Sequence, residues 1–323
     1  MRAVNQLGYG DPHKVLRLDE VERPTPTDGQ VLVRVVAASI NAIDWRTVYA
    51  QPILVRLLGG LRRPGDSRQM GHDLAGVVEA VGPGRTDLAP GDEVYGNCSG
   101  GLAEYVVGQD FVRKPANLTF EQAAAVPVAG RTALQAVHKH GQVEPGQRVV
   151  VIGAGGGVGT FAVQIAAALG ADVTAVTSTD KVELMGSIGA ARVIDYTTQD
   201  FTRMGDRYDV IVDVAGNYSI RAMRRVLADG GRIVLAAAGR GWFGMIGRLA
   251  GSTIRRKIGQ PVIFFISSGP REEQLATLRD MIEAGKITPV IDRTYPLDQA
   301  ADAISYVATE KARGKVVIKV ADG

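Results

Sequence analysis

The chain has little cysteine, few aromatic residues and no long apolar run, and each shortage excludes a class of protein. Its 323 residues include one cysteine, Cys98, so an internal disulfide and a multi-cysteine zinc site are both excluded. No apolar stretch approaches the roughly 18 residues of a membrane-spanning helix. The first residues, MRAVNQLGYGDPHK, lack the apolar core of a signal peptide. We therefore expect a reduced, cytoplasmic setting.

The chain also lacks a large excess of positive or negative charge, because its formal net charge is only +3. A nucleic-acid-binding protein usually has a basic stripe with interleaved aromatic residues, and aromatics make up only 6% of this chain. No nucleic-acid partner is expected, although the mild positive charge permits attraction of an anionic cofactor. Hydrophobic residues make up 46% and charged residues 22%, which is typical of a soluble globular protein long enough for two domains.

Residues 1–121 are predicted to form a β-rich domain. Glycine and proline separate short segments rich in valine and other apolar residues. The expected strands lie at 30–41, 73–84, 91–96 and 102–108. Short strands at such close spacing indicate a small barrel or sandwich.

Residues 122–267 are predicted to form a second, α/β domain. A helix is expected at 131–141, after an interruption at Pro127. Strands are then expected at 147–153, 172–178, 191–196, 208–214, 231–237 and 261–267, with helices at 158–169, 180–188 and 218–228. Nearly continuous apolar strands that alternate with helices are typical of a doubly wound parallel sheet. Residues 268–323 contain an amphipathic helix at 271–285 and closing strands, and we expect them to return and complete the first domain.

The stretch VVVIGAGGGVGTFAVQIA, residues 149–166, joins a stiff strand directly to a flexible loop. Residues 154–159 fit the pattern A-x-G-x-x-G, a dinucleotide fingerprint between a strand and a helix. Gly156 would let the backbone approach a pyrophosphate, and Gly159 would let the helix pack closely on the strand. The predicted cofactor-binding residues of this loop are Ala154, Gly155, Gly156, Gly157, Val158 and Gly159. The alternative is a tight turn in an α/β fold that binds no nucleotide.

The end of the next strand favours NADPH over NADH. An enzyme that uses NAD usually has an acidic residue about 20 positions after the glycines, where it binds the ribose hydroxyls. Here Ser178 stands at that point and Lys181 adds positive charge, which suits a 2′-phosphate. Asp180 is the evidence against this interpretation, because a small rotation would bring its carboxylate to the ribose.

Several stretches together resemble the medium-chain dehydrogenase/reductase superfamily, and most closely its zinc-independent quinone oxidoreductase branch, which includes the zeta-crystallins. They are SINAIDW (39–45), GHDLAGVVEAVG (71–82), GDEVYG (91–96), AAAVPVAGRTALQAV (123–137), the glycine loop and the closing RGKVVIKV. The resemblance implies a GroES-like domain joined to a Rossmann domain, with the cofactor in the cleft. It also implies a homo-oligomer, and we expect a homodimer.

The resemblance implies further cofactor contacts. Thr132 matches a threonine beside the nicotinamide, and Lys181 and Tyr196 match a lysine and a tyrosine near the 2′-phosphate. Ala215 and Ala238 lie in strand ends, DVAG and AAAG, that match backbone lining the adenosine and nicotinamide ribose. Lys315 lies where the C-terminal segment of the family returns toward the cofactor.

The zinc alcohol dehydrogenases of this superfamily bind their catalytic zinc through positions that match Asn41, His72 and Val128. Only the histidine is a suitable ligand here, and one imidazole does not make the three-ligand site that catalytic zinc requires. No metal is therefore expected. A zinc-type alcohol dehydrogenase with atypical ligands, such as Asp44, Asp73 or Cys98, stays open as an alternative.

The function predicted from these features is hydride transfer from NADPH to a quinone or an α,β-unsaturated carbonyl. Such acceptors depend less on a Lewis acid than a simple alcohol does, because hydride addition gives a delocalised enolate or hydroquinone anion. Candidate catalytic residues are Asn41 (an amide donor), Arg46 (a positive charge), Tyr49 (a hydroxyl) and His72 (polarisation or proton donation). Each also suits a structural role. A non-catalytic NADPH-binding or RNA-binding protein of the crystallin type is a further alternative.

Two segments, 51–65 and 240–260, combine arginines with large apolar residues. The resemblance places both at the border of the substrate entrance. There they would suit a lipophilic acceptor or rest on a membrane surface. The alternative is that the apolar residues pack on the protein and the arginines face water.

Overall fold

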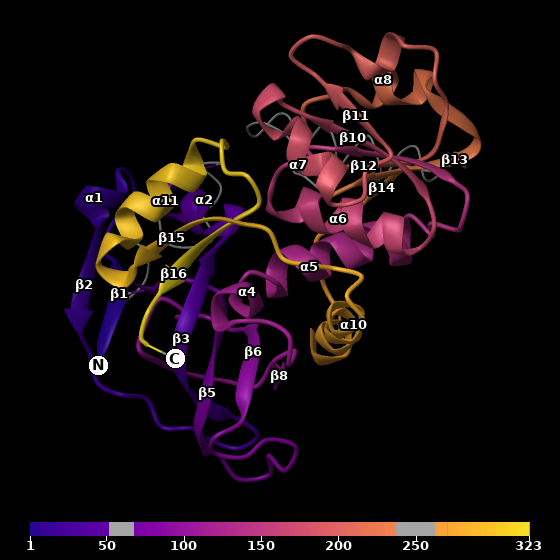
Figure 1. Ribbon diagram of the computed structural model, residues 1–323. Coiled ribbons are helices and arrows are strands. Elements are labelled where there is room, and N and C mark those ends of the chain that lie inside the picture. Colours follow the sequence, from indigo (N-terminus) through magenta and orange to yellow (C-terminus); the bar gives the residue numbers. More distant parts are fainter. Residues whose placement is uncertain (52–67, 237–261, 270, 323) are drawn as a thin grey trace. The chain divides into compact units, whose positions relative to one another are not determined.

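The computed structural model describes residues 1–51, 68–236, 262–269 and 271–322 (Figure 1). The chain divides into two compact units. Unit 1 comprises Met1–Ala129, Pro270–Gly285 and Pro289–Gly323, and unit 2 comprises Gly130–Gly269 and Lys286–Thr288. Of the predicted features, most of segment 51–65, all of segment 240–260 and Ala238 lie outside the described residues.

Unit 1 is built around a long buried strand, β3 (Val31–Ile40). Its valines and alanines favour a strand that is covered on both faces. β3 pairs antiparallel with strands on both sides. The sheet runs in the order β15 (Ile291–Pro296), β16 (Lys315–Lys319), β3, β5 (Asp73–Val81), β6 (Glu93–Asn97) and β8 (Phe111–Arg113), and β7 (Tyr105–Gly108) also pairs with β3. The C-terminal strands are therefore part of the sheet of unit 1.

Short elements cover this sheet. A second sheet has the order β2 (Leu16–Glu20), β1 (Arg2–Gln6) and β4 (Arg68–Gln69). The helices of unit 1 are α1 (Pro12–Val15), α2 (Ala42–Tyr49), α4 (Phe120–Ala124), α10 (Arg271–Glu283) and α11 (Ala300–Ala308). α11 packs against α1 and α2, and its buried Ile304 joins Leu74 and Ile318 in one apolar core. The helix after β3 is thereby fixed close to the ends of β3 and β16.

Unit 2 contains a parallel sheet with helices between its strands (Figure 1). The strand order is β11 (Arg192–Asp195), β10 (Asp172–Thr177), β9 (Arg148–Ile152), β12 (Tyr208–Asp213), β13 (Leu227–Leu235) and β14 (Val262–Phe264). The helices include α6 (Gly157–Ala168), α7 (Val182–Ser187) and α8 (Ile220–Arg225). This is the order of a dinucleotide-binding fold, whose ligand site lies where the chain direction across the sheet reverses, between β9 and β12.

The structure differs from the sequence prediction around Pro127. The expected helix at 131–141 begins earlier, as α5 (Pro127–Leu134), and ends in a π-helical turn, Gln135–His140. Proline is well suited to the start of a helix, because it lacks an N–H that would stay unbonded there. The first unit also extends beyond the predicted boundary at residue 121, because α4 packs on β3 and β5.

Candidate functional site

The glycine loop lies at the carboxyl end of β9 in unit 2. Gly153 has a left-handed backbone (φ +81°), and a Cβ there would lie 2.7 Å from the Cβ of Ala215. The N–H groups of Gly153 and Ala154 both donate to Val176 O, at 3.1 Å. The loop is therefore fixed between the ends of β10 and β12, and Ala215, predicted from its strand end, lies directly against it.

Each of the next glycines has a different environment. A Cβ on Gly159 would collide with the backbone of Gly153 and Ala154, so this glycine permits the close packing of α6 on the loop. A Cβ on Gly155 would collide with the side chain of Lys181. At Gly156, by contrast, the nearest protein atom would be Gly153 O at 3.6 Å. No packing within the described protein requires glycine at 156, which fits a position kept small for a ligand.

The first turn of α6 follows directly, with Gly156 as its N-cap residue. Gly157, Val158 and Gly159 form this turn, where a helix has no earlier carbonyls to accept its N–H groups. Such a helix start attracts phosphate through these N–H groups and through the helix dipole. The residues present therefore fit the pyrophosphate of a dinucleotide.

The residues predicted to contact the adenosine side come from two neighbouring strand ends. Ser178 follows β10, and Lys181 lies three residues later with only 7% of its surface exposed. Tyr196 follows β11, is half exposed, and donates its backbone N–H to Thr177 O at 3.0 Å. The structure therefore brings Ser178, Lys181 and Tyr196 to the edge of the sheet where the glycine loop lies.

Two carboxylates at this edge are held by hydroxyl groups. Ser178 Oγ donates to Asp180 Oδ1 at 2.5 Å. Asp195, which the sequence analysis did not select, accepts hydrogen bonds from Thr179 Oγ1 (2.6 Å) and from the hydroxyl and backbone N–H of Thr197 (2.7 and 2.9 Å). These bonds lower the pKa of Asp195. Asp180 is thus held within its own loop and Asp195 is held partly by the neighbouring loop, by bonds that a ribose would have to replace.

Thr132, predicted from the resemblance to lie beside the nicotinamide, is a partly buried residue of α5. Asp213, at the end of β12, is fully buried and accepts the N–H groups of Ala215 (3.1 Å) and Gly216 (2.8 Å). This carboxylate fixes the turn that holds Ala215 against the glycine loop.

A buried polar cluster lies in unit 1, around the fully buried carboxylate of Asp73 at the start of β5. Asp73 Oδ2 accepts from Asn41 Nδ2 at 2.9 Å, and Asp73 Oδ1 accepts from Asn97 Nδ2 at 3.0 Å. The backbone N–H of Val128 donates to both oxygens at 3.1 Å. We call Asn41, Asp44, His72, Asp73, Asn97, Val128 and Lys315 the Asp73 cluster.

Lys315 supplies the buried positive charge of the Asp73 cluster. Its Nζ lies 3.6 Å from Asp73 Oδ2 and donates to Asn41 Oδ1 at 2.6 Å and Ile40 O at 3.3 Å. Burial lowers the pKa of Lys315, and the carboxylates of Asp73 and Asp44 oppose that effect. The resemblance had assigned Lys315 to the cofactor. Its side chain is only 3% exposed and is bonded within unit 1, so Lys315 belongs to the Asp73 cluster, and its contact with the cofactor stays a prediction.

A second carboxylate holds the imidazole of the Asp73 cluster. Asp44, in the first turn of α2, accepts the backbone N–H of Asn41 at 2.7 Å through Oδ2. Its Oδ1 lies 2.8 Å from Nδ1 of His72. The Asp44 side chain is fully buried, whereas that of His72 is 28% exposed. The cluster thus has one ring that is bonded on its buried side and reaches solvent.

The other two predicted catalytic residues lie on α2 and are partly buried. The guanidinium of Arg46 lies 5.3 Å from the ring centre of Trp45, and the ring of Tyr49 meets that of Trp45 edge to face at 6.4 Å. In the described part of the chain, these side chains contact Trp45 rather than the Asp73 cluster. The structure therefore brings Asn41 and His72 into one network, but not Arg46 and Tyr49.

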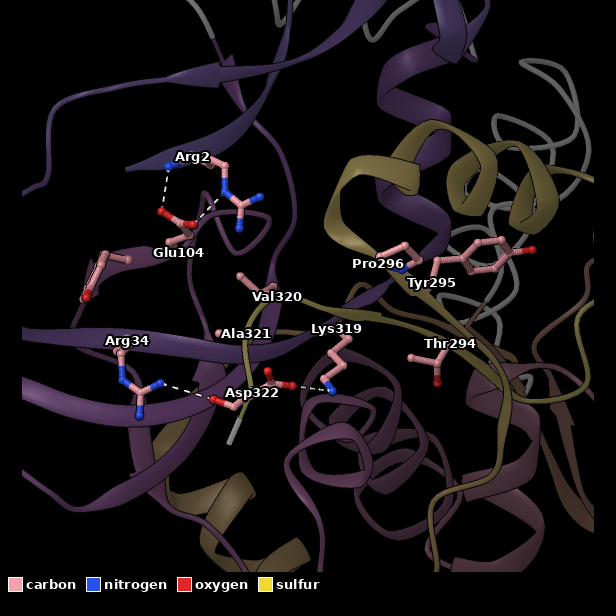
Figure 2. A pocket seen from close by; sticks show the side chains of 11 residues that line it. Arg2, Arg34, Glu104, Thr294, Tyr295, Pro296, Lys319, Val320, Ala321 and Asp322 are labelled. Carbon is pink, nitrogen blue, oxygen red and sulfur yellow. Dashed lines mark hydrogen bonds and ion pairs between the residues drawn. The ribbon is translucent and has the colours of Figure 1, made fainter.

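Unit 1 also has a surface pocket of about 700 Å³ near the C-terminus (Figure 2). Figure 2 shows two ion pairs in its lining, Arg2 with Glu104 and Lys319 with Asp322, each at 2.7 Å. The guanidinium of Arg34 donates to Asp322 O at 3.5 Å. Because two of its three basic side chains are paired within the lining, we do not select it as the functional site.

Comparisons with known proteins agree with this geometry. The model of the alcohol dehydrogenase GroES-like domain matches residues 27–115, and that of the zinc-binding dehydrogenases matches residues 188–318. The 2-methylene-furan-3-one reductase of Solanum lycopersicum is 34% identical, with 98% of this chain and 79% of the relative covered. The chain belongs to the medium-chain dehydrogenase/reductase superfamily.

Two further similarities place it within this superfamily. The chloroplastic NADPH-dependent alkenal/one oxidoreductase of Arabidopsis thaliana is 32% identical, with 94% of this chain and 76% of the relative covered. The structure of the quinone oxidoreductase from Coxiella burnetii has a TM-score of 0.87 and 28% identity, with 99% of each chain covered. The predicted superfamily and fold class, a GroES-like domain plus a Rossmann domain, are confirmed.

In this medium-chain dehydrogenase/reductase, the three positions that match zinc ligands do lie in one cluster. Asn41 and Val128 both donate to Asp73, and His72 contacts Asp44. Within the described residues, no group of three or more histidine, cysteine and acidic side chains is arranged to hold a metal ion. Metal independence stays a prediction, and its chemical basis is that Asn41 and Val128 offer donor N–H groups here rather than ligand atoms.

The sequence did not indicate that Asn97 and Lys315 are the partners of Asp73. Asp44 and Asp73 had been considered only as substitute metal ligands. The signal for Asp44 was local, because an acidic residue three positions after Asn41 has capping-box spacing. The partners of Asp73 come from segments far apart in the chain, so no local pattern identifies them.

Proposed function

We propose that this chain is an NADPH-dependent oxidoreductase that reduces a quinone or an α,β-unsaturated carbonyl. The observation that supports this most directly is the glycine loop, whose Gly156 has no packing reason to be glycine and whose neighbour Gly155 lies against Lys181. Two relatives support the reaction class, because their names describe reduction of an alkenal or enone and of a methylene furanone.

NADPH, when bound, supplies the hydride. The residues of unit 2 would hold it: the first turn of α6 would bind the pyrophosphate, and Lys181 would bind the 2′-phosphate with Ser178 and Tyr196 beside it. Ala215 and Asp213 keep the strand end in place against the loop. Thr132 and Ala238 remain predicted contacts, the latter outside the described residues.

The acceptor class follows from the donor set of the Asp73 cluster. Asn41 and Lys315 are bonded within the cluster, whereas the ring of His72 is 28% exposed and can donate to an anion that develops on the substrate during reduction. A conjugated acceptor gives such an anion, whereas a simple alcohol needs a Lewis acid to lose its proton.

The experiment that tests this proposal combines binding with turnover. We expect the purified full chain to oxidise NADPH with at least one simple quinone or conjugated enone. Replacing Lys181 with Met keeps the stem that packs on Gly155 and removes the charge. NADPH affinity should then fall by about tenfold or more, and NADH affinity should not change.

Lys139→Glu, an exposed residue of unit 2, is the matched control and should bind NADPH normally. Tighter binding of NADH than NADPH in the unmodified protein would contradict the cofactor assignment. Binding of NADPH without turnover of any quinone or enone would favour the non-catalytic alternative. Stoichiometric zinc by elemental analysis, with activity lost on chelation and restored by zinc, would favour the alcohol dehydrogenase alternative.

We also propose a cytoplasmic homodimer, on the basis of the superfamily resemblance and the single cysteine. Within the described residues, no helix is long and apolar enough to cross a membrane. Light scattering of the purified chain tests the dimer. The predicted lipophilic acceptor and membrane contact depend on segments outside the described residues. A comparison of short-chain and long-chain acceptors, with and without lipid vesicles, tests both.

A further inference from the structure

Reduction of a conjugated acceptor requires a proton as well as a hydride. After hydride addition, an enone becomes an enolate and a quinone becomes a hydroquinone anion. Each of these anions must gain a proton before the product is complete. This requirement rests on the proposed function, and either a side chain of the protein or water must meet it.

His72 has the geometry of a positioned acid. Its Nδ1 lies 2.8 Å from Oδ1 of Asp44, whose other oxygen is held by the backbone N–H of Asn41 at 2.7 Å. Because an ionised carboxylate only accepts hydrogen bonds, this contact places a proton on Nδ1 of the ring. A second proton, which makes the ring an imidazolium, is then carried by Nε2.

The Asp73 cluster places more negative than positive charge around the ring of His72. Among the described residues of the cluster, the charged groups are the carboxylates of Asp44 on α2 and Asp73 on β5 and the ammonium of Lys315 on β16. One negative charge is left over while His72 is neutral. Both carboxylates and the ammonium are buried, so water screens them little. A proton on His72 balances the cluster.

The partial exposure of His72 allows this proton to be exchanged. Its side chain is 28% exposed, whereas the side chains of Asp44, Asp73 and Lys315 are at most 3% exposed. It is therefore the titratable member of the Asp73 cluster that combines a buried carboxylate partner with exposure at the protein surface. Imidazole also has an ordinary pKa close to neutral pH, which suits an acid that must be recharged in each cycle.

We propose that His72 is the general acid that protonates the reduced substrate, and that Asp44 is its positioning residue. The Nε2–H bond breaks, its electron pair stays on the ring nitrogen, and a new bond forms to the α-carbon of the enolate or the oxygen of the hydroquinone anion. The neutral imidazole then takes a proton from water. Asp44 keeps Nδ1 protonated throughout and stabilises the imidazolium.

The test uses the full chain and an α-methyl enone chosen from those that the unmodified protein reduces. Protonation at the α-carbon creates a stereocentre, so the product reports whether a fixed donor acted. With His72→Asn, we expect the rate to fall by about 100-fold or more, NADPH affinity to stay unchanged, and the product to approach a racemic mixture. The control is His13→Gln, an exposed histidine paired with Asp302, which should change none of these.

The pH profile of the Asp44→Asn variant distinguishes a positioning role of Asp44 from a purely structural role. Loss of the carboxylate makes the imidazolium less stable, so the fall in kcat/KM on the alkaline side should move to lower pH by about one unit or more. Unchanged rate, stereochemistry and pH profile in His72→Asn would overturn the inference while leaving the proposed function intact. Zinc bound to His72 would overturn the inference, since a metal would take the nitrogen that donates. Failure of the unmodified protein to reduce any enone or quinone would overturn both.

Discussion

The glycine loop of unit 2 is shaped by its backbone, whereas the Asp73 cluster of unit 1 is shaped by its side chains. The loop uses backbone atoms and the absence of side chains, within the short segment from Gly153 to Gly159. The Asp73 cluster uses side-chain charges and amides from segments as far apart as residues 41 and 315. The loop leaves room at Gly156, as a ligand site would, whereas the Asp73 cluster stays intact only while each buried charge keeps its partner. The difference implies that substitutions should damage the two regions in different ways.

The largest expected effect is on stability, from Lys315→Met. This change leaves Asp73 buried without a positive partner, which should lower the free energy of unfolding by about 3–5 kcal/mol. Urea unfolding measures it. Lys319→Met is the control, because Lys319 lies on the same strand but is half exposed in its pair with Asp322. That control should cost less than about 1 kcal/mol. A similar loss of unfolding free energy in both variants would show that the buried charge pair does not stabilise the fold.

The next effect should be confined to cofactor binding, from Gly156→Ala. The protein itself has room for this methyl group. The methyl group would, however, occupy the space of a pyrophosphate bound at the start of α6, so NADPH affinity should fall by about tenfold or more. Stability should fall by no more than about 1 kcal/mol, the usual cost at a helix N-cap. Calorimetric titration and thermal unfolding measure the two quantities.

Two matched variants sharpen this test. Gly159→Ala should lose both stability and affinity, because its methyl group collides with the backbone of Gly153. Gly186→Ala, on α7, meets no protein atom within 4 Å and should lose neither. If Gly156→Ala bound NADPH normally, the loop would not be the pyrophosphate site.

A smaller effect is expected from Tyr95→Phe, which breaks one buried hydrogen bond in unit 1. The Tyr95 hydroxyl donates to Leu275 O on α10 at 2.6 Å, and its loss should cost about 1 kcal/mol. Burial raises the pKa of Tyr95 above its ordinary value of 10.0. The unfolded chain therefore ionises first, and this residue makes stability fall as pH rises above 10.

The Tyr95→Phe variant should consequently lose less stability than the parent between neutral pH and pH 11. Tyr306→Phe is a second test, because the hydroxyl of Tyr306 bonds to the carboxylate of Asp292 and the pKa of Tyr306 is also raised, so its loss should likewise reduce the alkaline sensitivity. Equal alkaline sensitivity in parent and Tyr95→Phe would refute this assignment.

The smallest effect is a change in thiol reactivity. Burial raises the pKa of Cys98 to about 12, so little thiolate is present at pH 8 and alkylation of the folded chain should be slow. Cys98 follows Asn97, a member of the Asp73 cluster. Lys315→Met should therefore speed alkylation, whereas Gly156→Ala should not. Fast alkylation of the unmodified folded protein would contradict the burial of this thiol.

The sequence predicted the elements of unit 2 better than those of unit 1. Strand β9, the loop and α6 follow one another, so their pattern of valines, glycines and small apolar residues is contained in a single window. The helix at Pro127 was predicted to begin too late, because proline was treated as an interruption although it also suits a helix start. The bounds of the short strands in unit 1 also shifted, since their ends are decided by pairing with distant strands.

For the candidate site, the difference between what the sequence predicted and what the structure shows is larger. Asn41 and His72 were selected from motifs, and they do meet in one network, but the carboxylates between them were not given that role. Lys315 was assigned to the cofactor; the structure shows its ammonium beside Asp73, and its contact with the cofactor stays a prediction. Arg46 and Tyr49 share a helix with Asp44 but contact Trp45, because a helix directs successive residues to different faces.

The sequence by itself determined the dinucleotide loop, the parallel sheet around it and the superfamily, because these depend on residue types at short, fixed spacings. Only the tertiary structure decided which charges share the interior of unit 1. The antiparallel pairing of β3 with β5 and β16 brings Asn41, Asp73 and Lys315 together from remote positions. A buried charge pairs with the group that the fold places in contact with it. Because a buried charge without a partner would cost desolvation free energy, that pairing is specific.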